Sequence, residues 1–221
     1  MTPSPAPAQP TGADAQLPAH ERVYRQLRNR ILWGLLMPGA PLTLRGLGTE
    51  LGVSMTPVRE AVRRLAAEGA LSVSASGRIS APELSDERLE ELASIRALLE
   101  PELGARALPR AHLALIDRLD IMNHRVDEAI VKTDVPGYIR TNLEFHRTLY
   151  LRAQAPAMLA LTESIWLQAG PTMRALYARR QRSEATANHR KILAALRAGD
   201  EPGLRLAIRA DVTQGLRMLI G

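Results

Sequence analysis

The stretch Leu51-Gly-Val-Ser-Met-Thr-Pro-Val-Arg-Glu-Ala-Val-Arg-Arg-Leu-Ala-Ala-Glu-Gly69 has the pattern of the turn and second helix of a helix-turn-helix. Gly52 is placed to end a helix that begins near Arg45, because glycine adopts the left-handed conformation that closes helices. Ser54 is placed to cap the next helix. Pro57 falls in the first turn of that helix, where its missing N–H is harmless. The stretch therefore predicts two helices joined by a tight turn.

The second of these helices has an apolar face and a basic face. Apolar residues recur at helical spacing and are expected to face a core, namely Val58, Ala61, Val62 and Leu65. Arg59, Arg63 and Arg64 point away from that core. The first turn carries Thr56 and Arg59, a combination suited to entering a DNA major groove N-terminus first. The alternative is an exposed basic helix end without a partner, but the cap, proline, arginine and apolar positions all agree with DNA binding.

The segment from His20 to Pro82 resembles the winged helix-turn-helix of GntR-type bacterial transcription regulators. Their signature runs close to Gly-Val-Ser-Arg-Thr-Pro-Val-Arg-Glu-Ala-Leu, followed by Arg-Leu and Glu-Gly. This chain departs from the signature at Met55, where the family more often has arginine. The candidate DNA-binding residues are Arg45, Ser54, Thr56, Pro57, Arg59, Arg63 and Gly77.

A small hairpin is expected after the recognition helix, with strands at 70–73 and 78–81 and Gly77 in the turn. In the family this hairpin is the wing, whose tip approaches the minor groove. An ordinary surface hairpin would have the same sequence pattern, so Gly77 and Arg78 are candidates on the strength of the resemblance.

Positive charge is concentrated in the N-terminal part of the chain. Residues 19–82 contain nine arginines and four glutamates and so carry +5 of the formal net charge of +6. Phosphate attraction requires cations gathered where the DNA backbone lies. The balance indicates one DNA-binding module attached to a nearly neutral remainder.

Composition excludes several other classes of protein. Aromatic residues make up 3% of the chain, which favours helical cores and argues against a base-stacking surface for single strands. Cysteine is absent, so disulfides and thiolate metal sites are excluded. No apolar run approaches the length of a membrane span, and no leader pattern opens the sequence. We expect a cytoplasmic protein with no membrane contact.

The predicted fold class is mainly α, in three segments. Residues 1–18 are rich in Pro and Ala and predict a disordered tail; residues 19–82 predict the winged helix-turn-helix; residues 83–221 predict an all-α antiparallel bundle for effector binding and dimerisation. Helices are expected at about 21–36, 44–51, 55–69, 85 onward, 109–132, 135–153, 156–180, 183–198 and 201–220, with breaks that include 169–171.

Arg96 interrupts an apolar stripe in the first helix of this bundle. Leu89, Leu92, Leu99 and Leu103 repeat around it at heptad-like positions, and Pro101 is expected to kink the helix. A buried guanidinium without a partner is costly. Two interpretations therefore stay open: a salt bridge to Glu100 at i+4, or an anion-binding role for Arg96.

Two pairs of polar residues are placed to converge inside the bundle. Asn142 and His146 are four residues apart and project from one helix face. His189 lies ten residues before Gly199, and Asp211 eleven after Asp200. In an antiparallel hairpin both would stand about 15–17 Å from the turn, level with each other. A lone histidine is more often an ordinary core or surface residue. His20, His112 and His124 lack such partners and are expected at the surface.

This spacing resembles the FCD-type effector domain of one large GntR subfamily. The family pattern is Asp-x-x-x-His on one helix, then a His that is followed eleven residues later by Gly-Asp, as from His189 to Asp200 here, then a third His on the last helix. Two of the four usual ligands have changed here, to Asn142 and Asp211, while His146 and His189 remain. The resemblance implies a divalent metal ion such as zinc, nickel, manganese or iron. It also implies a small organic-acid effector beside the metal, held by an arginine, for which Arg96 is the candidate.

Together these features predict a ligand-responsive transcription regulator, a repressor, and not an enzyme. One short recognition helix covers one half-site, which predicts a homodimer on palindromic double-stranded operator DNA. Two alternatives are an architectural DNA-binding dimer without an effector and a metal-dependent hydrolase. The second lacks a His-Glu-x-x-His or Gly-x-Ser-x-Gly motif and gives no reason for the basic helix.

Overall fold

The computed structural model describes the backbone of residues 17–179 and 186–217 and the side chains of residues 17–174 and 186–214. The tail expected over 1–18 lies outside this range except for its last two residues. The fold is mainly α, as predicted. Among the described residues, no helix combines the length and hydropathy needed to cross a membrane.

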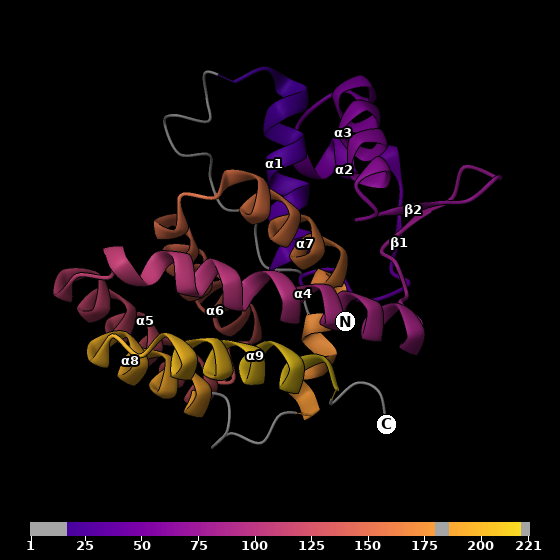
Figure 1. Cartoon of the computed structure of the whole chain (residues 1–221). Helices are drawn as coiled ribbons and strands as arrows, with labels where there is room; N and C mark the ends of the chain where they lie inside the picture. The colour runs from indigo at the N-terminus through magenta and orange to yellow at the C-terminus, as the bar shows by residue number, and fades with distance from the viewer. Residues whose placement is uncertain (1–16, 180–185, 218–221) are drawn as a thin grey trace.

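The N-terminal part has the predicted order of three helices and a hairpin (Figure 1). In chain order its elements are α1 (Ala19–Leu32), β1 (Pro41–Leu42), α2 (Leu44–Leu51), α3 (Met55–Ala67), β2 (Ser72–Val73) and β3 (Ile79–Ser80). Helix α1 ends at Leu32 rather than Leu36, because Gly34 turns the chain with a φ of 63°. Strand β1 was not predicted, since two residues are too few to show an alternating pattern.

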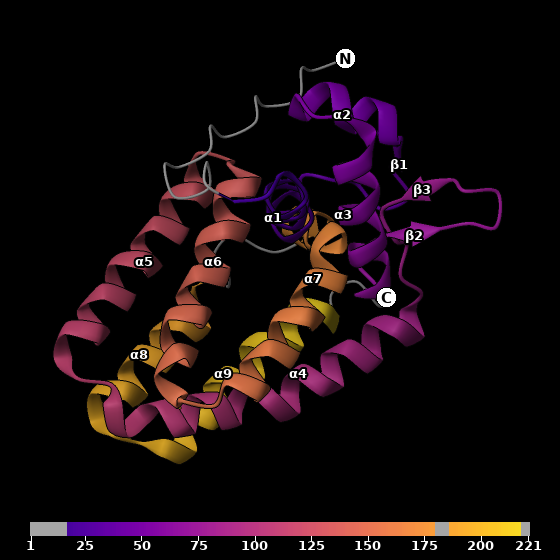
Figure 2. The ribbon, with the colours of Figure 1, turned by 90° about the horizontal axis from the view of Figure 1, so that it is seen from above.

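The three strands form a small antiparallel sheet in the order β1-β3-β2. Ile79 of the central strand is buried and is the pairing partner of both Leu42 and Val73. The hairpin turn closes where the amide of Gly77, at φ 80°, donates to the carbonyl of Ser74. The β2–β3 hairpin projects away from the helices, as a wing would (Figure 2).

The C-terminal part contains the six predicted helices and two short 3-10 turns. They are α4 (Asp86–Ala107), η2 (Leu108–Arg110), α5 (Leu113–Val131), α6 (Val135–Tyr150), η3 (Leu151–Ala153), α7 (Pro156–Arg179), α8 (Ala187–Ala198) and α9 (Glu201–Arg217). Ser85 caps α4 by accepting from the amide of Arg88. Helix α9 packs against both α4 and α8, and α5 packs against α6 (Figure 2). The start expected for α8 at residue 183 lies outside the described residues.

In the C-terminal part, helix boundaries also differ from the predictions. The break expected at 169–171 is wrong, because α7 continues through Pro171 and is held by packing against α1 and α4. The helix expected from Pro109 begins at Leu113, because residues 108–110 form a 3-10 turn and the His112 side chain caps the new helix. Pro101 lies inside α4, which runs on to Ala107.

The N-terminal part is packed directly on the C-terminal helices, through α1 and α7. A Cβ at Gly170 would lie 2.3 Å from the carbonyl oxygen of Ile31, so only glycine fits where these two helices cross. Beside the crossing, Arg28 pairs with Glu163 at 3.4 Å. One hydrophobic cluster includes residues of α1, α3 and α7. A shift of α7 at this crossing therefore requires α1 to move with it.

Candidate functional site

The turn before α3 brings its N-terminus to the surface. Gly52 closes α2 in the left-handed conformation, with a φ of 65°. Ser54 occupies the N-cap position of α3, but its side chain makes no capping hydrogen bond, contrary to expectation. Pro57 explains this, because it stands third in the helix, where a capping side chain often finds its N–H donor, and proline has none. The Ser54 hydroxyl thus remains available to an external acceptor.

The nine arginines of residues 19–82 divide into two groups. Within the described residues, four of them are exposed and form no ion pair: Arg45, Arg59, Arg63 and Arg78. The other five have protein partners: Arg22 with the carbonyl of Leu17, Arg25 with Glu21, Arg28 with Glu163, Arg30 with Glu50, and Arg64 with Glu21 and Glu68. Uncompensated positive charge therefore lies on α2, α3 and the hairpin.

Arg64 shows how the paired group is held. Its guanidinium lies 3.5 Å from the centre of the Tyr24 ring, a cation–π contact between α3 and α1. The hydroxyl of Tyr24 donates to Glu68, and its pKa is raised by burial and by that carboxylate. Arg64 thus fixes the two helices together, whereas Arg59 and Arg63 stay open to solvent.

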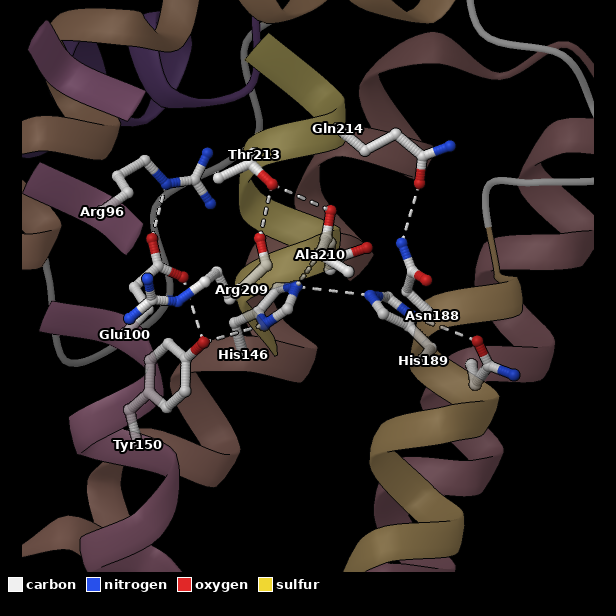
Figure 3. A network of polar contacts seen from close by, with 12 residues as sticks. Arg96, Glu100, His146, Tyr150, Asn188, His189, Arg209, Ala210, Thr213 and Gln214 are labelled. Carbon is white, nitrogen blue, oxygen red and sulfur yellow. Dashed lines mark hydrogen bonds and ion pairs between the residues drawn. The ribbon is translucent and has the colours of Figure 1, made fainter. Parts of the chain in front are cut away.

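The second candidate site is a buried polar centre between α6, α8 and α9 (Figure 3). Nε2 of His146 lies 3.3 Å from Nε2 of His189 and 3.1 Å from Oδ2 of Asp211. One ligand atom from each of these three residues lies within 4.8 Å of the others. All three side chains are buried. The structure thus brings together three of the four predicted metal ligands.

Asn142, the fourth predicted ligand, lies one turn before His146 on α6. Its side chain is buried, and its Oδ1 accepts no hydrogen bond from any described residue. Burying an amide oxygen without a hydrogen-bond donor costs the free energy of its lost hydration, and no new bond compensates for it. This atom is therefore available to a bound group.

Hydrogen bonds behind the two imidazoles fix their orientation. Nδ1 of His189 faces Oδ1 of Asn123 at 3.1 Å, and the ring is stacked on Phe145 with a centroid separation of 4.0 Å. Nδ1 of His146 lies 3.2 Å from the hydroxyl of Tyr150. Both Nε2 atoms consequently face the centre, as in metal sites whose second ring nitrogen is held by a neighbour.

Beside this centre, the Glu100 carboxylate receives three donors from three helices. Nε of Arg96 lies 2.5 Å from Oε1, the indole N–H of Trp166 donates to the same oxygen at 3.0 Å, and the hydroxyl of Tyr150 donates to Oε2 at 3.0 Å. Glu100 is fully buried, and Arg96 is 6% exposed. The structure therefore contains the Arg96–Glu100 salt bridge, one of the two interpretations of Arg96.

The Glu100 cluster also sets the protonation of its members. Burial alone would lower the pKa of Arg96, but the carboxylate of Glu100 raises it above that of a free guanidinium. Burial, followed by Glu100, raises the pKa of Tyr150 well above its ordinary value. Arg96 therefore stays charged, and Tyr150 keeps its proton and uses it in the hydrogen bond to Glu100.

Sequence reasoning missed three residues of this site. Tyr150 follows His146 at i+4, a spacing that could have identified it. Asn123 and Trp166 lie on α5 and α7, far from the other members along the chain. No local pattern connects either residue to them.

Comparison with known proteins identifies both parts of the chain. The model of "Bacterial regulatory proteins, gntR family" matches residues 19–79, and that of the FCD domain matches residues 91–214. The HTH-type transcriptional regulator McbR of Escherichia coli (strain K12) is 32% identical over 203 residues, which cover 90% of this chain and 91% of McbR. A protein of Paenarthrobacter nicotinovorans, described as the probable D-xylose utilization operon transcriptional repressor, is 28% identical, over 77% of this chain and 75% of its own.

Solved structures agree. The structure of Escherichia coli McbR/YncC superimposes with a TM-score of 0.85 at 30% identity, covering 93% of this chain and 98% of McbR. A transcriptional regulator from Rhodococcus sp. RHA1 shares the fold with a TM-score of 0.77 at 22% identity, over 91% of this chain and 97% of its own. The relatives are transcription regulators, which confirms that the chain is not an enzyme.

Removing the charge of Glu100 should be strongly destabilising. Glu100→Gln keeps the shape of the side chain but leaves Arg96 as a buried cation without its carboxylate, and we expect a loss of about 3–5 kcal/mol of unfolding free energy. Urea denaturation measures it. The matched control is Glu128→Gln, which removes the solvent-exposed i,i+4 pair with Lys132 and should cost at most about 0.5 kcal/mol. Equal stabilities of the two variants would contradict this account of the cluster.

Proposed function

Because the chain belongs to the GntR family of bacterial regulatory proteins and carries an FCD domain, we propose that it is a repressor that binds palindromic operator DNA as a homodimer and responds to a small carboxylate held beside a divalent metal ion. It would act in the cytoplasm. The observation that carries the DNA-binding role is the group of four exposed arginines on α2, α3 and the hairpin that have no acidic partner among the described residues.

The first turn of α3 supplies the groups that would enter the major groove. Thr56 and Arg59 are exposed there, and Arg63 follows one turn later on the same side. An arginine fork can bind the O6 and N7 atoms of guanine through two hydrogen bonds. Pro57 lies in the same turn, and the Ser54 hydroxyl can donate a hydrogen bond to a phosphate of the DNA backbone. Helix α3 thus provides both base and backbone contacts.

Residues outside α3 would hold the backbone of the DNA. Arg45 lies in the first turn of α2 and faces the same depression as Ser54. Gly77 and Arg78 lie in the exposed part of the hairpin. Because Gly77 has no side chain, this backbone turn could enter a narrow groove of the DNA. Because one α3 covers one half-site, two copies related by two-fold symmetry would give a palindromic operator.

The hydrogen-bond pattern of the buried centre supports a metal ion. The O–H of Tyr150 donates a hydrogen bond to Glu100, so the N–H at Nδ1 of His146 would donate to the Tyr150 oxygen. Nδ1 of His189 likewise donates to Asn123. In a neutral imidazole the other nitrogen then carries a lone pair. Two imidazole nitrogens and a carboxylate oxygen thus face one another at 3.1–3.3 Å, an arrangement that a positive charge between them, a proton or a metal ion, would stabilise.

The donor set fits a divalent ion. Atoms bound tetrahedrally at 2.0–2.2 Å from zinc are about 3.3–3.6 Å apart, close to the two separations seen here. His146, His189 and Asp211 would hold the ion, and Asn142 offers a fourth oxygen. Two imidazoles and oxygen donors also suit nickel, manganese or iron. A bound ion would supply positive charge and an open coordination position for an effector oxygen.

Arg96 is the residue that would anchor the effector's carboxylate. Only its Nε is engaged by Glu100, and neither Nη atom forms a hydrogen bond with a described residue. Arg96 and Asp211 also lie close enough to interact electrostatically, which places the guanidinium near the metal ligands. An effector could thus contact Arg96 with one oxygen and the ion with another.

Helix α7 would provide the link from this site to the DNA-binding part. Trp166 of α7 donates to Glu100, the partner of Arg96. One turn away on the same helix, Glu163 pairs with Arg28 of α1. A carboxylate that draws Arg96 away from Glu100 would change the hold on Trp166 and so bias the position of α1 and α3. Such a bias is what effector control requires.

Arg59→Ala should weaken operator binding by about 1–3 kcal/mol, because it removes a two-pronged contact to a base. The measurement is a fluorescence-anisotropy titration of a selected operator at several salt concentrations. Arg125→Ala is the matched control, since Arg125 is equally exposed but lies on α5. The proposal is wrong if Arg59→Ala binds the operator with unchanged affinity and unchanged salt dependence.

Metal binding should depend on both buried histidines. The wild-type protein should bind about one divalent ion per chain and melt at a higher temperature with it, since the ion favours the folded state. His146→Ala and His189→Ala should each lose the ion, whereas His124→Ala, exposed on α5, should retain it. Elemental analysis and calorimetric titration with Zn²⁺ and Ni²⁺ measure this. Stoichiometric metal in either buried variant would refute the assignment.

A further inference from the structure

Met55 is an exposed apolar side chain in the most basic part of the molecule. It is the first residue of α3, and 51% of its surface is exposed. It lines a surface depression of about 590 Å³ between α2 and the start of α3; the other lining residues are Arg45, Gly48, Thr49, Gly52, Val53 and Ser54. The charged residue in this lining is Arg45, which has no acidic partner among the described residues.

Helical geometry places Met55 at the edge of the face that carries the free arginines. Successive residues turn by about 100°, so Arg59 and Arg63 follow Met55 within a sector of about 80°. The buried residues Val62, Val58 and Leu65 lie about 20°, 60° and 80° from Met55 in the opposite direction, so Met55 stands at the border between the arginines and the core. Because Met55 is the first residue of the helix and 51% of its surface stays exposed, it is accessible to a group that also contacts Arg59.

On the premise that α3 enters the major groove as proposed above, we propose that Met55 determines sequence specificity by contacting the C5-methyl group of a thymine. That methyl group is the apolar feature that the major groove displays, and apolar side chains are its complement. The flexible thioether side chain of methionine can adapt to it. Met55 and Arg59 are about 6 Å apart along the helix, less than two base-pair steps of about 3.4 Å. The half-site should therefore hold this thymine within two base pairs of the guanine bound by Arg59.

Replacing thymidine by 2′-deoxyuridine tests this contact, because it removes only the methyl group. The operator is first selected from random duplex DNA with the wild-type protein, and each thymidine of the half-site is then replaced in turn. One replacement should weaken wild-type binding by about fourfold per half-site, the equivalent of one buried methyl group of about 0.8 kcal/mol. The same replacement should leave the affinity of Met55→Ala unchanged. Met55→Leu should stay sensitive to it.

Met37 provides the matched control, since it is exposed to the same 51% but lies outside α2, α3 and the hairpin. Met37→Ala should respond to the replacement as the wild type does. The inference is overturned if no thymidine is sensitive in the wild type, or if Met55→Ala remains equally sensitive. If the wild-type protein selects no sequence at all, the proposed DNA-binding function itself fails, and the role of Met55 fails with it.

Discussion

The buried carboxylate of Glu100 is the constraint on which the rest of the structure depends. It accepts from Arg96 on its own helix, from Tyr150 of α6 and from Trp166 of α7. A buried charge is tolerated only when such partners compensate for its lost hydration. Through Tyr150 the same carboxylate is connected to His146 of the proposed metal site. In this account, folding and the proposed ligand binding depend on one group.

This arrangement would let the proposed effector site inside the helical bundle act on DNA binding. Trp166 belongs to α7, and α7 is also the helix on which α1 is seated, without space for a side chain at Gly170. A close-packed crossing of this kind cannot absorb a shift gradually. Under the proposed function, a change in the partners of Glu100 would be transmitted to the helix-turn-helix through this crossing.

The sequence predicts those parts of the molecule that depend on local spacing. Residues 51–69 define the turn and α3, and the i,i+4 pairs give the Arg96–Glu100 bridge and the shared face of Asn142 and His146. His189 and Asp211 lie at the same height because they are nearly the same number of residues from the turn between α8 and α9. The bond of Trp166 to Glu100 and that of Asn123 to His189 depend on how α7 and α5 pack, which no local pattern encodes. The break expected at 169–171 failed for the same reason.

The most direct test of the coupling is operator affinity, measured with bound metal during titration with mono-, di- and tricarboxylates, for the wild type, Arg96→Met and Trp166→Phe. The account predicts that one carboxylate changes wild-type affinity by at least about fivefold. Arg96→Met leaves Glu100 without its cation and should be less stable, but below its melting temperature it should bind the operator and lose the response, and Trp166→Phe should bind the carboxylate with a diminished response. A wild-type affinity that no carboxylate changes would favour an architectural DNA-binding dimer, and a full response in Arg96→Met would contradict the account.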